Sequence, residues 1–246
     1  MNRKSRLRFL VLALGLVLLL SSCSGGAMKL TYENGAYRNS KNDAAFLIAP
    51  ICYRAASQMN QEIVARISGK NTADVELYAI ENMDRAEWLT DKNYAVYYSE
   101  RVELPSLRQM QPNRITLCKT GAYTFALGYI ENRAEVDDIV DIYEKGTTVP
   151  AGKIIPSPES RCELLFSSSA YPGLAYSLEY WKFAEDVDVY APLTPSGGIP
   201  DLYPGISAEI VNGEAVFHLG KALIYDRSED RVYSIGTLLD SYFTAG

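Results

Sequence analysis

Short apolar and aromatic runs, each closed by turn-forming residues, recur along this sequence and restrict it to a strand-rich fold. Asn34-Gly35 and Asn212-Gly213 each separate two such runs. An Asn-Gly pair readily adopts the positive φ angles that a tight type I′ hairpin turn needs. The flanking runs are rich in tyrosine, valine and isoleucine, which favour strands. The sequence therefore predicts antiparallel hairpins joined into a meander.

The segment 133–145 has the clearest helical period. Its apolar side chains share one face, at Val136, Ile139, Val140 and Tyr143. Asn132 is expected to cap the start of this helix with Glu135 as its reciprocal partner, and Gly146 to end it in a left-handed conformation. With a short C-terminal helix at 237–243, the sequence predicts an α+β fold in which strands dominate.

One globular domain is expected over residues 28–246. The segment 147–160 contains three prolines and no period, so it is expected to be a loop. Two subdomains meeting at 147–160 are the alternative organisation.

The N-terminus has the layout of an export signal. Arg3, Lys4, Arg6 and Arg8 precede an unbroken apolar run from Phe9 to Leu20. This run is about a dozen residues long, whereas a helix that spans a bilayer needs roughly 20. An uncleaved N-terminal anchor is the alternative.

Leu20-Ser21-Ser22-Cys23 follows this run and resembles the lipobox of bacterial lipoproteins. The resemblance covers the first 23 residues. It implies that residues 1–22 are removed as a signal peptide and that Cys23 begins the mature chain with a thioether-linked diacylglycerol. Two or three acyl chains anchor a protein stably in a membrane. Residues 23–27 would then be a lipidated cysteine and a short flexible tether.

This resemblance implies a protein held on the extracytoplasmic side of the cell membrane or of an outer membrane. Ser24, which follows the cysteine, favours the outer membrane in an envelope with two membranes. The membrane partner would be contacted through the lipid on Cys23.

The charge of the mature chain argues against nucleic acid as a partner. Without the four basic residues of the signal, 20 basic and 30 acidic side chains remain, a net charge of −10. Such a body repels phosphate backbones and anionic lipid surfaces.

Cys52, Cys118 and Cys162 also remain. They allow one disulfide and a free thiol, or three thiols, and the sequence does not choose between these. Each has an apolar neighbour, which favours buried structural cysteines.

No catalytic, metal or cofactor motif is present in the sequence. His218 is the one histidine and lies in an apolar run, where a histidine hydrogen-bonded within a sheet is the expected role. A hydrolase would need a serine or Cys162 brought to His218 by the fold. Asp186 and Asp188 share one side of an extended segment, but the calcium-loop pattern is absent.

Tyrosine is the most conspicuous feature of the composition, with 18 tyrosines and two tryptophans, all after the signal. Aromatic side chains are enriched at binding surfaces. The candidate binding surface is formed by Tyr171, Tyr176, Tyr180 and Trp181. Packing of aromatic residues across strands is the competing interpretation.

The sequence is therefore compatible with three functions. The first is a binding or accessory protein of the cell envelope that contacts a protein partner. The second is a solute- or glycan-binding receptor that uses the Tyr/Trp surface. The third is an extracytoplasmic hydrolase, which no motif supports.

Overall fold

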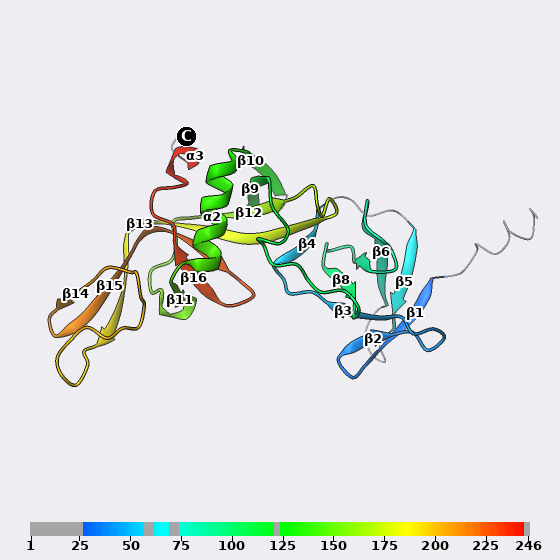
Figure 1. The fold of residues 1–246 in the computed structure, drawn as a ribbon, viewed down its shortest axis with the longest axis horizontal. Coiled ribbons are helices and arrows are strands. Elements are labelled where there is room, and N and C mark those ends of the chain that lie inside the picture. The colour runs from blue at the N-terminus through cyan, green and yellow to red at the C-terminus, as the bar shows by residue number, and fades with distance from the viewer. Residues whose placement is uncertain (1–26, 57–61, 69–73, 121–123, 244–246) are drawn as a thin grey trace, which may run out of the picture.

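The computed structural model describes residues 27–56, 62–68, 74–120 and 124–243, and its strands form two sheets (Figure 1). The prediction of a strand-dominated chain with an amphipathic helix and a short C-terminal helix is confirmed. None of the helices in these ranges is long and apolar enough to cross a membrane.

The first sheet is a closed barrel of seven short strands. The strands are β1 (Met28–Glu33), β2 (Ala36–Arg38), β3 (Ala45–Ile48), β5 (Ile63–Ile67), β6 (Val75–Ala79), β7 (Trp88–Thr90) and β8 (Val96–Ser99). Their order around the barrel is β1-β2-β3-β8-β7-β6-β5, and a parallel pairing of β1 with β5 closes it. The prediction of simple antiparallel hairpins is wrong here, since closure pairs the two edges that a meander would leave open.

The barrel is filled by its own side chains. Its buried core consists of Leu30, Phe46, Ala65, Leu77, Leu89 and Tyr97. The first hairpin forms as predicted, because Asn34 and Gly35 have φ angles of 51° and 84°. Small barrels of this kind enclose a packed core.

The second sheet has nine strands. They are β4 (Tyr53–Ala55), β9 (Arg114–Thr120), β10 (Thr124–Ile130), β11 (Thr148–Pro150), β12 (Ser160–Ser167), β13 (Leu174–Pro192), β14 (Ala208–Val211), β15 (Glu214–Asp226) and β16 (Arg231–Ser234). The main order is β10-β9-β12-β13-β15-β16-β11, with β14 beside β15 and β4 beside β13.

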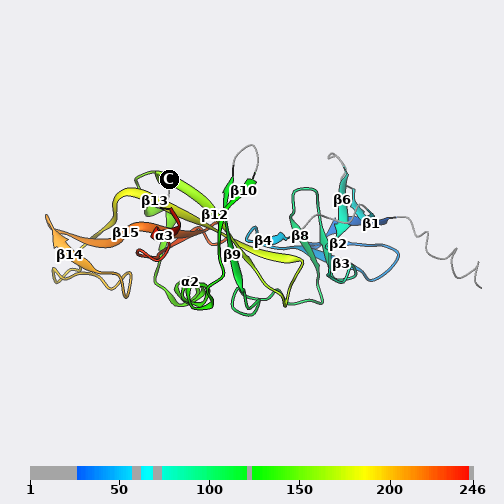
Figure 2. The same ribbon diagram turned by 90° about the horizontal axis from the view of Figure 1, so that it is seen from above.

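Strand β4 links the two sheets. It lies in the chain between β3 and β5 of the barrel, yet it pairs with the first residues of β13, Leu174–Tyr176. Strand β15 pairs with β13 farther along, from Glu179 onward. Both views place β4 between the barrel and the larger sheet (Figures 1 and 2).

The segment 147–160 is not the place where the chain passes from one sheet to the other. It contains β11 and the 3-10 turn η2 (Ala151–Lys153), and both its ends belong to the larger sheet. The chain instead leaves the barrel after β8, through residues 100–113.

Helix α2 (Arg133–Lys145) covers one face of the larger sheet, and its predicted apolar face is confirmed by buried Val136, Ile139 and Val140. Asn132 caps it as expected, because its side chain accepts a hydrogen bond from the Ala134 N–H over 3.0 Å. Helix α3 (Asp240–Phe243) closes the described chain.

The prediction of a left-handed Gly146 is wrong. Its φ is −68°, in extended backbone, and its N–H bonds to the Ile142 carbonyl over 2.8 Å. A Cβ at this position would lie 2.2 Å from the Ile142 oxygen, so glycine is required by close approach. Glu135 also differs from expectation, since its carboxylate accepts a hydrogen bond from the Tyr242 hydroxyl.

Candidate binding site

The larger sheet has one face under α2 and an opposite face that we call the open face. On β12 the side chains of Cys162, Leu164 and Phe166 are buried with the α2 core. The alternate positions point the other way. The open face is defined by Arg161, Glu163, Leu165 and Ser167 on β12 and by their cross-strand partners on β13, Ala175, Ser177, Glu179 and Trp181.

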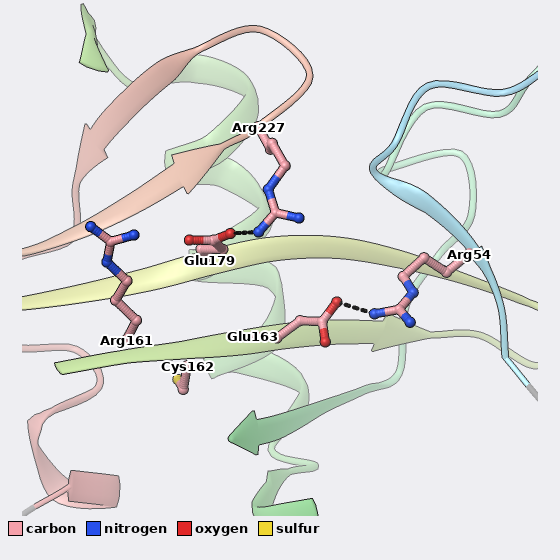
Figure 3. A pocket seen from close by; sticks show the side chains of 6 residues that line it. All are labelled: Arg54, Arg161, Cys162, Glu163, Glu179 and Arg227. Atoms are coloured by element: carbon pink, nitrogen blue, oxygen red, sulfur yellow. Dashed lines mark hydrogen bonds and ion pairs between the residues drawn. The ribbon is translucent and has the colours of Figure 1, made fainter. Parts of the chain in front are cut away.

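Two glutamates lie directly opposite each other in the centre of this face. Glu163 and Glu179 are register partners, and their side chains are only 11% and 14% exposed. Like charges across a strand pair are destabilising unless they are compensated. Arg54 from β4 bonds to Glu163 over 2.6 Å, and Arg227 bonds to Glu179 (Figure 3).

These side chains line a hollow of about 260 Å³, which we call the small hollow. Its lining residues are Arg54, Arg161, Cys162, Glu163, Glu179 and Arg227. The Cys162 side chain points away from the charged groups in Figure 3. Three arginines and two glutamates therefore give the small hollow a net positive charge, although the chain as a whole is acidic.

A stack of side chains borders the small hollow. The guanidinium of Arg161 lies 4.9 Å from the ring centroid of Trp181, and the Tyr225 ring lies 4.3 Å from the Trp181 ring. The indole N–H of Trp181 donates to Glu179 Oε2 over 2.9 Å. Cation–π contact and hydrogen bonding together fix this stack.

A second, larger hollow of about 550 Å³ lies on the same face and shares Arg54 and Glu163 with the first. Its lining includes Arg114, Tyr94 and Tyr129. The Arg114 guanidinium lies 4.9 Å from the Tyr129 ring centroid. Each hollow therefore has an arginine on an aromatic ring, and the Arg54–Glu163 ion pair stands between them.

Tyr94 reaches the large hollow from a constrained turn. Its φ is 66°, in the left-handed region that non-glycine residues rarely adopt. Asp91 holds the turn, because its Oδ1 accepts hydrogen bonds from Asn93 N–H at 2.8 Å and Ala95 N–H at 3.0 Å. The Tyr94 carbonyl in turn accepts from the Ala55 N–H over 3.1 Å. The barrel thus supplies a fixed wall to the hollow.

Strand β10 forms an apolar edge next to the large hollow. It is the last strand of the main order and pairs only with β9 among the described strands. Phe125, Leu127 and Tyr129 are 54%, 53% and 53% exposed. Exposed apolar edge strands are sites at which proteins associate.

The four aromatic residues predicted as a binding surface do not form one exposed surface. Tyr176 and Tyr180 are 6% and 1% exposed on the face under α2, and Trp181 is 8% exposed and points to the opposite side. Tyr171 is half-buried against the α2 core. Side chains alternate between the two faces of β13, so Trp181 is separated from Tyr176 and Tyr180, which α2 covers.

Tyr176 instead belongs to a buried hydrogen-bond network. Its hydroxyl lies 2.6 Å from that of Tyr143, which donates to Asp226 Oδ2 over 2.7 Å. Asp226 is fully buried, and its Oδ1 accepts from the Ser228 N–H over 2.7 Å. Burial raises the pKa of both tyrosines above their ordinary value, so they remain neutral donors.

The three described cysteines, Cys52, Cys118 and Cys162, are all buried free thiols. Burial raises the pKa of each thiol, to about 12 for Cys162. The expectation of buried structural cysteines is confirmed.

His218 is hydrogen-bonded within the sheet, as predicted. Its Nδ1 lies 2.8 Å from Asp188 Oδ1 and its Nε2 lies 3.6 Å from Glu209 Oε1. Both ring nitrogens therefore face carboxylates. Among the described residues no cluster has the composition of a metal site.

Sequence reasoning missed the arginines of the open face. Arg161 and Glu163 alternate with buried Cys162 and Leu164, so their shared face could have been predicted from β12 alone. Arg54 and Arg227 come from distant segments, and no local pattern indicates their pairing. The lipobox residues Leu20, Ser21, Ser22 and Cys23 lie outside the described residues.

No family model, curated protein or solved structure matches this chain.

Proposed function

We propose that this protein is a lipid-anchored binding protein of the cell envelope, tethered through Cys23 on the extracytoplasmic side of a membrane. The open face of the larger sheet is its binding surface. The tether of residues 23–27 is short, so the body and its binding surface stay close to the lipid. The localisation depends on the lipobox resemblance of Leu20-Ser21-Ser22-Cys23.

The observation that carries the binding role is the pair of arginine-lined hollows beside an exposed edge strand. Arg54 and Arg114 line the large hollow, and Tyr129, which also lines it, belongs to the exposed edge strand β10. Interfaces commonly combine arginine and aromatic anchors with an apolar centre. This combination favours a protein partner in the envelope, and the protein would serve as an accessory component.

A solute- or glycan-binding receptor is the second candidate. The large hollow favours it, because about 550 Å³ is within the range of small-molecule sites. Tyr94 and Tyr129 would supply the aromatic contacts in place of the buried Tyr176 and Tyr180. A hydrolase is not favoured, since His218 faces two carboxylates.

Photo-crosslinking in cells tests the proposal. A photoreactive residue at Tyr129 is compared with one at Ile155, which is 87% exposed and lies outside the large hollow. We expect one abundant adduct from position 129 only, identified by mass spectrometry. Equal labelling from both positions, or none from position 129 at full expression, would exclude this surface as a protein interface.

A Cys23→Ala variant tests the proposed membrane localisation in the same cells. The unlipidated chain is expected to leave the membrane fraction or to remain uncleaved, and the adduct from position 129 should be lost. A variant that still matures and partitions into membranes would contradict the lipobox interpretation.

A further inference from the structure

Arg161 is bonded differently from the other two arginines of the small hollow. Arg54 is paired with Glu163, and Arg227 is paired with Glu179. Arg161 makes no ion pair among the described residues, and its guanidinium contacts the Trp181 ring instead. A guanidinium carries five N–H donors and stays charged at every physiological pH. Most of the hydrogen-bonding capacity of Arg161 is therefore unused.

The position of Arg161 is fixed by side chains that are themselves bonded. Trp181 lies between Arg161 and Tyr225, and its N–H donates to Glu179. The hydroxyl of Tyr225 donates to Asp230 over 3.1 Å. A charged group held in this way loses little conformational entropy when a ligand binds.

Of the two glutamates in the small hollow, Glu179 does not block an anion that approaches Arg161. Both oxygens of Glu179 are bonded, one to Trp181 and the other to Arg227. Glu163 is bonded to Arg54 and to the Ser177 hydroxyl through Oε1, but its buried Oε2 has no hydrogen-bond partner among the described residues and would repel an anion placed next to it. The anion is therefore expected next to Arg161 and Arg227, above the fully bonded Glu179. The remaining positive charge of the small hollow is that of Arg161, so the local field favours a negative group.

We propose that the small hollow binds one anionic group, a carboxylate or a phosphate, through Arg161, with the free donors of Arg227 beside it. Arginine recognises both groups with paired hydrogen bonds. A volume of about 260 Å³ suits a single group or a small ligand, and not a polymer segment. The inference deepens the proposed function and rests on it, because it names the chemistry of the group that the binding surface receives.

Anion titrations of the full-length lipidated protein in neutral detergent test the inference. Sodium phosphate and sodium acetate are added at constant ionic strength against sodium chloride, and tryptophan fluorescence is followed. Both tryptophans are buried, but only Trp181 contacts Arg161, and Trp88 packs in the core cluster under α2. A fluorescence change that is absent from Arg161→Gln is therefore assigned to the small hollow. We expect a saturable fluorescence change with at least one of the two anions. The anion that binds more tightly indicates whether the hollow prefers a phosphate or a carboxylate.

Arg161→Gln and Arg85→Gln form a matched pair of variants. Both remove one positive charge from an exposed arginine, and Arg85 lies in a turn of the barrel away from the hollow. We expect Arg161→Gln to weaken anion binding about tenfold or more, because a hydrogen bond to a charged group contributes that much. Arg85→Gln should bind as the wild type does. Arg161→Lys keeps the charge but lacks the paired N–H donors of the guanidinium, so its affinity for the anion should lie between those of Arg161→Gln and the wild type.

A lack of saturable binding by either anion, or equal binding by Arg161→Gln and wild type, would overturn the inference. The crosslink from position 129 reports on the neighbouring large hollow and does not need an anion. Loss of anion binding with an intact crosslink would therefore refute the anion site alone, and the proposed function would stand.

Discussion

Replacing Arg54 with methionine tests the ion pair that joins Arg54 on β4 to Glu163 on β12. Methionine keeps most of the length and apolar volume of the arginine stem and removes its charge. Glu163 would then keep the Ser177 hydroxyl at 2.7 Å and lose the 2.6 Å bond to Arg54. The carboxylate is only 11% exposed, so water replaces the lost bond poorly.

The partial burial of this ion pair sets how much stability Arg54→Met should lose. Removing one partner of a fully buried ion pair costs about 3–5 kcal/mol, and a hydrogen bond to a charged group contributes about 1.5–3 kcal/mol. Arg54 is 35% exposed, and Glu163 retains one donor, so the lower range applies. We expect Arg54→Met to reduce the free energy of unfolding by about 2 kcal/mol, which lowers Tm by roughly 4–8 °C in a chain of this size.

Thermal unfolding of the full-length protein in neutral detergent, followed by circular dichroism, measures the effect. Arg54→Met/Glu163→Gln removes both charges and should lose less stability than the two single variants added together, by about 1 kcal/mol or more. Arg38→Met is the control, because the Arg38–Glu100 pair is 41% and 36% exposed and should contribute less than about 1 kcal/mol. Additive single effects at positions 54 and 163, or equal losses for Arg54→Met and Arg38→Met, would refute the reasoning.

Three further predictions concern pH, thiols and the end of α2. Burial raises the pKa of four tyrosines to about 12, from an ordinary value of 10. They are Tyr53, Tyr97, Tyr180 and Tyr233. Tyrosines of the unfolded chain ionise at lower pH than these four do in the folded protein, so the stability that these four contribute is intact below pH 10 and is lost as pH rises through about 12. Absorbance at alkaline pH should show the four tyrosines ionising together with unfolding. Their ionisation in a protein that stays folded would contradict this prediction. A thiol reagent should label none of the three buried cysteines in the native protein and three thiols after denaturation; a fourth would mean that Cys23 carries no thioether. Gly146→Ala should reduce the free energy of unfolding by about 1–3 kcal/mol, since its Cβ would meet the Ile142 carbonyl oxygen at 2.2 Å. A Cβ at Gly152 would meet no atom of the described residues within 4 Å apart from its chain neighbours, so Gly152→Ala should be neutral in the same thermal assay.

The elements that sequence reasoning predicted well are those specified by neighbouring residues. The Asn34-Gly35 and Asn212-Gly213 turns have positive φ at both positions, as their chemistry requires. Helix α2 follows from its own period and its Asn132 cap. The conformation of Gly146 was predicted wrongly because glycine is needed there for close approach to the Ile142 carbonyl. In the sequence, such a glycine looks the same as one that ends a helix in a left-handed conformation.

The closed barrel and the binding face could not be predicted in this way. The parallel pair β1–β5 joins segments that no turn connects, and nothing local to Leu30 or Ile67 indicates it. The open face depends on Arg54, which reaches Glu163 from another part of the chain. The aromatic residues of β13 were visible in the sequence, but which of its two faces α2 covers was not.

Strand β4 has a consequence for the order in which the protein can assemble. All seven barrel strands precede β9, so the barrel can close while the larger sheet is still being synthesised. Until β13 arrives, β4 keeps an unpaired edge, and Trp88 and Val96 lack the core that later covers them. A chain interrupted after β8 would expose both, which makes the first half of the molecule dependent on the second for its solubility.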